Sequence, residues 1–315
     1  MRYIDGLREG MRITEIYLCK SKQIAQTKAG KDYGNLVLQD KTGTIDSKIW
    51  ELNSPGVGTF EALDYVYVDA EVTMFQGNHQ LNIRRIRKAD EGEYLPADYL
   101  PVSTKDIELM YGELTEYVRS VKNPYLNRLA ASYFLEDAQF AKEFQFHSAA
   151  KSIHHGFVGG LLEHTLSVVK LCDYFAKHYS NINRDLLLTA AMFHDIGKLK
   201  ELSVLPENDY TDSGQLLGHI VIGVGMLTER IRNIPKFPEK LERELIHCIL
   251  SHHGELEYGS PKKPALLEAL ALSFADNTDA KMETMIEALQ KSGENQGWLG
   301  YNRLLETNIR KSTES

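Results

Sequence analysis

The sequence predicts an α+β protein of more than one domain, in which a small N-terminal β-barrel precedes an all-α domain. Two observations carry this prediction. Within residues 1–90, short segments alternate polar and apolar side chains, which is the period of a half-buried strand. After Ser103 the chain indicates helices instead, and apolar helical stretches recur through residues 160–290. At 315 residues the chain is long enough for two or three cores.

The N-terminal part is expected to form five short strands. The predicted strands cover residues 12–18, 35–40, 44–50, 65–72 and 80–83. Tight turns are expected at residues 40–43 and at Gly77-Asn78. So many short strands in so few residues favour a closed barrel of the OB-fold type. An unspecified small β domain is the alternative.

Residues 89–104 are predicted to be a boundary, because an acidic stretch is followed there by Pro96 and Pro101. Ser103 or Thr104 is the expected N-cap of the first helix, and a helix break is expected near Asn123-Pro124. The predicted organisation is therefore a barrel over residues 1–90, a linker with connecting helices over 91–145, a helical domain over 146–300, and a C-terminal tail over 301–315. The last residues of that tail, from Asn308 to Ser315, are polar and expected to fray.

Composition limits the classes of protein that the chain can be. The net charge of −8 argues against binding nucleic acid by the overall field, but leaves room for a local basic groove. Cys19, Cys172 and Cys248 are scattered, which favours a reducing cytoplasm and gives neither a disulfide framework nor a zinc ribbon. No apolar run is long enough to cross a membrane, and no secretion signal opens the chain. We therefore expect a cytoplasmic protein without a membrane partner.

Histidines and aspartates recur in an order that indicates a metal site. The chain has eleven histidines, and all except His79 and His147 lie between His154 and His253. An ionised carboxylate within an apolar helix is costly to bury unless it is paired or binds a cation. Several buried imidazoles and two carboxylates could meet this cost together by sharing a cation. The residues that stand within or at the end of apolar helical stretches are His164, His194, Asp195, His219, His252, His253 and Asp276.

Two of these groups are expected at helix ends. Adjacent residues on a helix point about 100° apart, so His194 and Asp195 converge best where a helix stops. Gly197 and Gly254 follow the two histidine groups closely and are expected to end their helices. Any one histidine taken alone is better explained as a hydrogen-bonded core residue than as a metal ligand. The ordered pattern H…HD…H…HH…D makes that alternative weak.

The same residues carry a resemblance to a known family. His164, His194-Asp195 and Asp276 match the signature of the HD superfamily of helical, metal-dependent phosphohydrolases, and His219 and His252 match the extra histidines of members with two metals. With the stretch 154–165 and an N-terminal OB-like barrel, the chain resembles the YhaM family of bacterial 3′-to-5′ exoribonucleases over nearly its whole length. The resemblance implies an all-α HD-type helical domain and metal-dependent hydrolysis of single-stranded RNA to nucleoside monophosphates. It leaves open whether single-stranded DNA is a second substrate.

The ligand types and the resemblance together suggest the metals. Imidazole and carboxylate without thiolate suit manganese, iron, cobalt, nickel or zinc, and the resemblance favours manganese. We expect His164, His194, Asp195 and Asp276 to hold a first ion, with Asp195 bridging to a second. His219 and His252 would complete the second site, and His253 is the alternative to His252. Two such ions would support in-line attack at phosphorus by a metal-activated hydroxide.

Three further residues are candidates for contact with the substrate. Lys198 follows His194 by one helical turn and could reach a phosphate oxygen. An exposed lysine just after a helix end is the alternative. His154 and His155 could line the substrate entrance, although a solvated helix start explains them equally well.

The barrel offers basic and aromatic residues of the kinds that grip single strands. The basic candidates are Lys20, Lys22, Lys28, Lys31, Arg84, Arg85, Arg87 and Lys88. The candidate stacking side chains are Tyr17, Tyr33, Trp50, Phe75 and His79, with Trp50 expected in the core rather than on the surface. Binding of RNA by the barrel is an expectation that rests mainly on the family.

Two other functions compete with an exoribonuclease. An HD phosphohydrolase could act on a small nucleotide or cyclic dinucleotide, although such an enzyme would not need the barrel. A non-catalytic nucleic-acid-binding module with a structural metal would not need six ligands and an open position. The sequence leaves the oligomeric state open, including a homo-oligomer.

Overall fold

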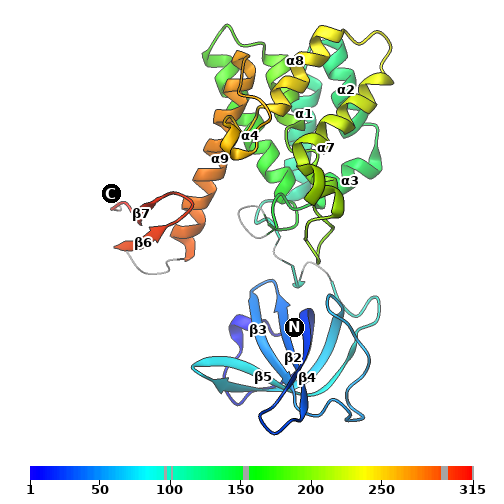
Figure 1. The fold of residues 1–315 in the computed structure, drawn as a ribbon, viewed down its shortest axis with the longest axis vertical. Helices are drawn as coiled ribbons and strands as arrows, with labels where there is room; N and C mark the ends of the chain where they lie inside the picture. Colours follow the sequence, from blue (N-terminus) through cyan, green and yellow to red (C-terminus); the bar gives the residue numbers. More distant parts are fainter. Residues whose placement is uncertain (96–97, 101, 152–155, 292–296, 314–315) are drawn as a thin grey trace. The chain divides into compact units, whose positions relative to one another are not determined.

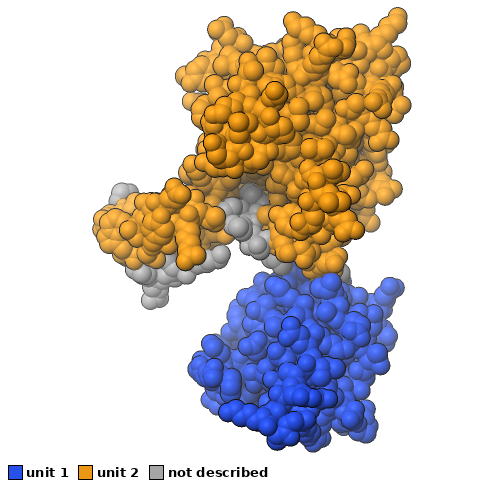
Figure 2. All heavy atoms as spheres, viewed as in Figure 1, with its two compact units in different colours: residues 1–102 blue, residues 103–315 orange. Residues whose placement is uncertain are grey.

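The chain divides into two compact units, residues 1–102 and 103–315 (Figure 2). The computed structural model describes residues 1–315 except 96–97, 101, 152–155, 292–296 and 314–315 (Figure 1). The boundary falls inside the predicted segment 89–104. The separate connecting segment expected over residues 91–145 is not a unit of its own, because its helices pack in the second unit.

Within residues 1–95, five strands close into a barrel in the order β1-β2-β3-β5-β4. Neighbouring strands are antiparallel except β3 and β5, which are parallel. This small Greek-key barrel has OB-fold architecture, so the predicted OB-like barrel is confirmed. The strands are β1 (Arg12–Gln26), β2 (Asp32–Asp40), β3 (Gly43–Ile49), β4 (Tyr65–Phe75) and β5 (Asn78–Lys88), with the 3-10 turn η1 (Ile4–Gly6) before them.

Alternation along the strands builds the barrel core. On β4, Val66, Val68, Ala70 and Val72 all point inward and are at most 1% exposed. Every second residue of a strand faces the same side, so one face of each strand fills the interior while the other remains available to solvent. β1 extends beyond the predicted strand over 12–18 and carries a bulge between Cys19 and Ser21.

The second unit is built of helices. The first helix begins after Asp106, whose carboxylate accepts a hydrogen bond from the Leu109 amide at 3.0 Å. Asp106 is therefore the N-cap, and the prediction of Ser103 or Thr104 is wrong. The predicted break at Asn123-Pro124 is confirmed, with Asn123 capping the second helix. The helices are α1 (Ile107–Ser120), α2 (Pro124–Phe134), α3 (Ala138–Phe146), α4 (Gly160–His178), α5 (Arg184–Phe193), α6 (Lys198–Glu201), α7 (Asp212–Arg232), α8 (Glu239–Leu250) and α9 (Leu267–Lys291), with the 3-10 turn η3 (Leu256–Tyr258).

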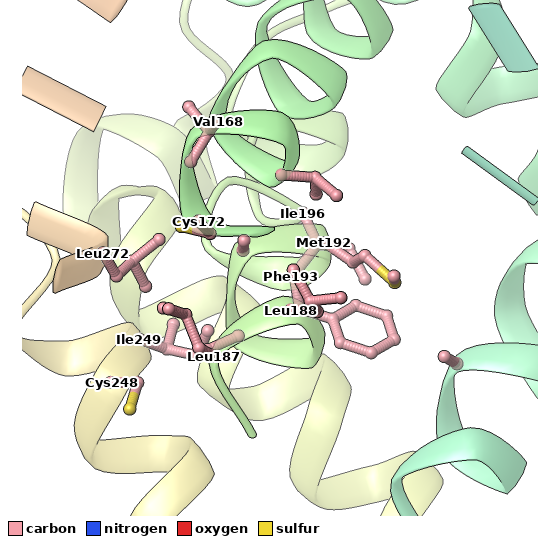
Figure 3. Close-up of a cluster of buried hydrophobic side chains, with 14 of the residues drawn as sticks. Val168, Cys172, Leu187, Leu188, Met192, Phe193, Ile196, Cys248, Ile249 and Leu272 are labelled. Carbon is pink, nitrogen blue, oxygen red and sulfur yellow. The ribbon is translucent and has the colours of Figure 1, made fainter. Parts of the chain in front are cut away.

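Helix α5 lies at the centre of this unit, and every residue from 186 to 193 is buried. Figure 3 shows Leu187, Leu188, Met192 and Phe193 of α5 among side chains from the neighbouring helices. These neighbours include Val168 and Cys172 of α4, Cys248 and Ile249 of α8, and Leu272 of α9. Because α5 is closely packed on all sides, its C-terminal end is held in place, and so is His194, which directly follows it.

The C-terminal residues differ from the expected frayed tail. β6 (Trp298–Asn302) and β7 (Thr307–Arg310) pair as an antiparallel hairpin beyond α9 (Figure 1). The Asn302 side-chain oxygen accepts from the Leu304 and Leu305 amides and closes the turn, while Ile309 is buried. The expected fraying from Asn308 on is therefore wrong for residues 308–310, which belong to β7. No helix in the described residues has the length and apolarity needed to span a membrane.

Candidate functional site

The predicted ligands come together from five parts of the helical unit. His164 lies on α4, and His219 lies on α7 just after a break in that helix. Asp276 lies on α9, one face of which packs against α4. Four ligands lie just beyond a helix end: His194 and Asp195 follow α5, and His252 and His253 follow Ser251, the C-cap of α8.

The first set of ligand atoms surrounds the Nε2 atom of His164. This atom lies 3.1 Å from His194 Nε2, 3.2 Å from Asp276 Oδ1 and 3.4 Å from Asp195 Oδ2. His194 Nε2 is in turn 3.4 Å from Asp195 Oδ2. The four residues expected to hold the first ion thus present their donor atoms to one point.

The second set faces the other oxygen of Asp195. Ring nitrogens of His219, His252 and His253 lie within 4.8 Å of one another. Asp195 Oδ1 is 3.5 Å from His219 Nε2 and 3.8 Å from His252 Nε2. The two carboxylate oxygens of Asp195 therefore point at different ligand sets. His252 and His253, which the sequence presented as alternatives, belong to the same set.

Backbone carbonyls orient three of the imidazoles. The Nδ1 atoms of His194, His252 and His253 lie 2.7–2.8 Å from the carbonyl oxygens of Ala191, Ile249 and Tyr258 respectively. A carbonyl only accepts, so each Nδ1 carries the proton and each Nε2 keeps its lone pair. That is the tautomer a metal-ligating histidine needs.

Two carboxylates that were not predicted from the sequence orient the remaining imidazoles. His164 Nδ1 lies 2.7 Å from Asp279 Oδ2, and His219 Nδ1 lies 3.0 Å from Glu201 Oε1. Asp279 stands three residues after Asp276 on the same helix face, a spacing from which it could have been found. Glu201 gives no comparable signal, because its partner His219 is 18 residues away.

The buried polar atoms at the centre fit a cation. Asp195 Oδ1, His219 Nε2 and His252 Nε2 are buried and have no hydrogen-bond partner among the described residues. Leaving such a group unpaired costs about 1–3 kcal/mol, and a cation would remove that cost. Burial lowers the pKa of His252 well below its usual value, which keeps its imidazole neutral. With no thiolate among the ligands, the two sets have the donor chemistry of a divalent metal site.

Two glycines set the backbone around His219. Gly218 interrupts α7 with φ 72°, and the freed His219 amide donates to Glu201 Oε1 at 2.9 Å. Gly254 was expected to end its helix, but α8 already stops at Leu250 with Ser251 as its C-cap, and Gly254, with φ +80°, closes the turn that follows. Gly197 was also expected to end its helix but has φ −63°, a right-handed helical value. A Cβ at Gly197 would lie 1.9 Å from the His219 carbonyl oxygen, so this glycine permits close approach of two backbones.

Lys198 is held at the centre rather than exposed. Its Nζ lies 2.7 Å from Asp195 Oδ2, and its side chain is only 18% exposed. It lines a cavity of about 470 Å³ together with His164, His252, His253, Asp276, Asn277, Tyr258 and three alanines, Ala149, Ala150 and Ala280. The predicted entrance residues His154 and His155 lie outside the described residues.

The structure corrects two of the candidate stacking residues on the barrel. Tyr17 was expected to stack on bases, but its ring is fully buried and its hydroxyl donates to the Arg2 carbonyl at 3.1 Å. Trp50 was expected in the core, but it is 43% exposed and packs against Tyr33 with ring centroids 5.1 Å apart. Trp50 directly follows the inward-facing Ile49, so alternation turns it outward.

The remaining barrel candidates are at least partly exposed. Lys31 follows the β1–β2 turn, Tyr33 lies on β2, and Phe75 lies at the β4–β5 turn. Lys20, Arg84 and Arg85 are exposed as well, and Arg84 pairs with Glu71 at 2.6 Å. The described contacts join Tyr33 to Trp50 and Lys48, but join none of these residues to Phe75 or Arg85.

Comparisons with known proteins agree with this architecture. The HD domain family matches residues 161–281. The chain is 37% identical to the 3'-5' exoribonuclease YhaM of Bacillus velezensis over 90% of its length and 89% of that protein. It is equally identical, with the same coverage, to YhaM of Bacillus subtilis, and 36% identical to YhaM of a Geobacillus species over 90% and 86% of the two chains.

Among solved structures, the second OB-fold domain of replication protein A from Methanococcus maripaludis aligns with 30% of this chain and 97% of its own. The identity is 20% and the TM-score 0.23. The family assignment rests on the YhaM proteins, because they match nine tenths of this chain at 37% sequence identity. The chain belongs to the YhaM family of HD-domain proteins.

Proposed function

We propose that this protein is a metal-dependent 3′-to-5′ exoribonuclease that hydrolyses single-stranded RNA to nucleoside monophosphates. The observation that carries the proposal is the position of Asp195 between two sets of ligand atoms beside a cavity. The YhaM relatives are named 3'-5' exoribonucleases, which supports RNA as substrate and the direction of degradation.

The residues that would hold the cations follow from the two sets. His164, His194, Asp276 and Asp195 Oδ2 would bind one ion. His219, His252, His253 and Asp195 Oδ1 would bind the other. Divalent cations in these positions supply Lewis-acid activation of water and neutralise charge at phosphorus. Manganese is the ion we favour, and iron, cobalt, nickel and zinc suit the same donors.

Lys198 is suited to hold the reacting phosphate. An ammonium group has three donors and no acceptor, so Lys198 can donate to Asp195 and to a phosphate oxygen at the same time. Its pairing with Asp195 keeps the positive charge at the cavity wall. We therefore assign it charge stabilisation and orientation of the phosphate, and not proton abstraction.

The barrel is suited to bind the strand that is being degraded. OB-folds bind oligonucleotides through the face of strands 2 and 3 and through the β1–β2 and β4–β5 loops. Lys31, Tyr33 and Phe75 lie on these elements. Stacking on aromatic rings does not depend on the 2′-hydroxyl, so single-stranded DNA is a second ligand that this surface can hold.

Two labels on the same oligonucleotide test the direction of hydrolysis. With manganese, an RNA labelled at its 5′ end should shorten stepwise into a ladder, while a label at the 3′ end should be released at once as mononucleotide. Immediate release of the 5′ label would contradict the proposal. Intact RNA together with hydrolysis of a nucleoside triphosphate or cyclic dinucleotide would contradict it in favour of a small-nucleotide phosphohydrolase.

A further inference from the structure

Tyr258 is an exposed aromatic residue in the wall of the cavity at the ligand centre. The residue is 68% exposed, and the same cavity is lined by His253, Lys198 and Asp276. The described residues provide no ring partner for Tyr258 and no hydrogen bond to its hydroxyl. Packing of the protein core therefore does not explain an aromatic ring at this position.

The backbone of Tyr258 is tied to the ligand set. Its carbonyl oxygen accepts the hydrogen bond from His253 Nδ1 at 2.8 Å, and its amide donates to the Glu255 carbonyl at 3.2 Å. Gly259 turns the chain with φ +85°, and the Ser260 hydroxyl donates to the Leu250 carbonyl at 3.1 Å. These bonds fix the η3 turn against the end of α8, so the ring starts from a defined point beside His253.

The chemistry of the cavity lining matches two parts of one nucleotide. The histidines, Asp276 and Lys198 make a charged region suited to a phosphate and its counter-ions. Ala149, Ala150 and Ala280 line the same cavity as Tyr258 and bring no charged or polar side chain to it. A nucleotide has a charged phosphate and a flat base, and aromatic side chains bind bases by stacking.

We propose that Tyr258 stacks on the base of the 3′-terminal nucleotide and thereby holds the adjoining phosphodiester at the Asp195 centre. The inference rests on the proposed exonuclease function and names the base subsite of that activity. Stacking uses the π-face that every base has, so the subsite requires a base but does not select one. Each new 3′-terminal nucleotide could then bind in the same place, whatever its base, as the RNA is shortened.

A pair of RNAs tests this subsite in the full-length, manganese-loaded protein. One RNA has an ordinary 3′ end, and the other ends in an abasic nucleotide of the same backbone. The readout is the ratio of kcat/KM for removal of the last residue from the two RNAs. Wild type should favour the base-containing end by roughly 5- to 100-fold, the range typical of stacking on an aromatic residue.

Three variants give the result its meaning. Tyr258→Ala should bring the ratio close to one, and Tyr258→Phe, which keeps the ring, should restore it. Tyr301→Ala is the matched control, because Tyr301 is 63% exposed on β6 and does not line the cavity. It should keep the wild-type ratio.

The possible failures are distinguishable. A wild-type ratio in Tyr258→Ala would overturn the stacking subsite. An equal loss on both RNAs would also overturn it, since Tyr258 would then only support the His253 turn. Failure of the wild-type protein to shorten either RNA would overturn the proposed function itself, and the subsite would fall with it.

Discussion

Gly197 and His219 approach so closely that a Cβ on Gly197 would lie 1.9 Å from the His219 carbonyl oxygen. Carbon and oxygen cannot approach to this distance without a bond, so only glycine fits. The contact holds the residues after Asp195 against the kinked part of α7, and His219 Nε2 lies 3.5 Å from Asp195 Oδ1. Close backbone packing thus sets the spacing between the bridging carboxylate and the second ligand set.

Gly197→Ala should therefore disrupt the second ligand set. The added methyl meets backbone atoms, which cannot rotate away, so α7 must shift and carry His219 from Asp195. We expect a fall of at least about tenfold in metal affinity, the scale seen when support of a ligand is lost. Metal titration by calorimetry measures this. Gly225→Ala is the control, because a Cβ there meets nothing within 4 Å. Unchanged metal binding in Gly197→Ala would contradict the account.

Glu201 and Asp279, which orient His219 and His164, should each affect the binding of a different metal ion. Glu201→Gln replaces the charged acceptor for His219 Nδ1 by a weaker neutral one, and Asp279→Asn does the same for His164 Nδ1. Each should lower the affinity of its own site by about 10- to 100-fold and leave the other site close to wild type. Stoichiometric metal titrations of the two variants resolve this. Equal weakening of both sites by either variant would mean that the two sets are not separate.

Asn208 should position one wall of the cavity. Its side-chain amide donates to the carbonyl oxygens of Ala150 and Lys151 at 2.9 and 3.0 Å, and its Oδ1 accepts from the Ser148 hydroxyl. Asn208→Ala removes these bonds, so KM for RNA should rise more than kcat falls. Asn208→Gly is the control for the left-handed backbone, since Asn208 has φ 46°. If Asn208→Gly restored the wild-type KM, the backbone and not the hydrogen bonds would be responsible.

Asp173 should stabilise the helical unit at neutral pH but not in acid. It is 5% exposed and pairs with Arg184 and Lys177, both at 2.7 Å. Burial alone would raise the pKa of Asp173, but hydrogen bonds from Lys177 and Arg184 outweigh it and lower the pKa. A pKa lowered by folding gives stability that is present above the unfolded value, about 3.9, and is lost as pH falls through the folded value.

Urea unfolding of Asp173→Asn at several pH values measures this contribution. The variant should be less stable than wild type by about 1–3 kcal/mol at pH 7, because the buried Asp173 position loses the charge-assisted hydrogen bonds that Arg184 and Lys177 donate to it. The difference should stay constant down to about pH 5 and shrink below about pH 4. A difference independent of pH would show that the loss comes from packing and not from the ionised pair.

Tyr33 and Lys31 should contribute to RNA binding in different ways. Tyr33→Ala should weaken binding of a single-stranded oligonucleotide by roughly 5-fold or more without changing the salt dependence, since stacking is lost. Lys31→Ala should reduce the slope of log K against log salt by about one, as expected for one phosphate contact. Ile24→Ala, at an exposed apolar position on β1, is the control. A changed salt slope in Tyr33→Ala would contradict the stacking role.

Much of the site could be predicted from the sequence because its ligands follow apolar helices in a fixed order. The same holds for the barrel, whose alternation is local. Tyr17 stands four residues after the inward-facing Ile13 on β1, so strand alternation predicts that its ring points into the barrel core. Glu201 could not be found, because a kink at Gly218 creates its contact with His219. The close approach of Gly197 to the His219 backbone could not be predicted either, because it depends on how α7 packs in the folded protein.

The most direct test of the account is the activity of Asp195→Asn on a 5′-labelled single-stranded RNA with manganese. Asp195 is the residue whose two oxygens face both ligand sets. The wild-type protein should produce a ladder of shortened RNA, while the variant should bind the same RNA and leave it intact. A ladder formed by Asp195→Asn at the wild-type rate would show that hydrolysis takes place elsewhere and would contradict the account.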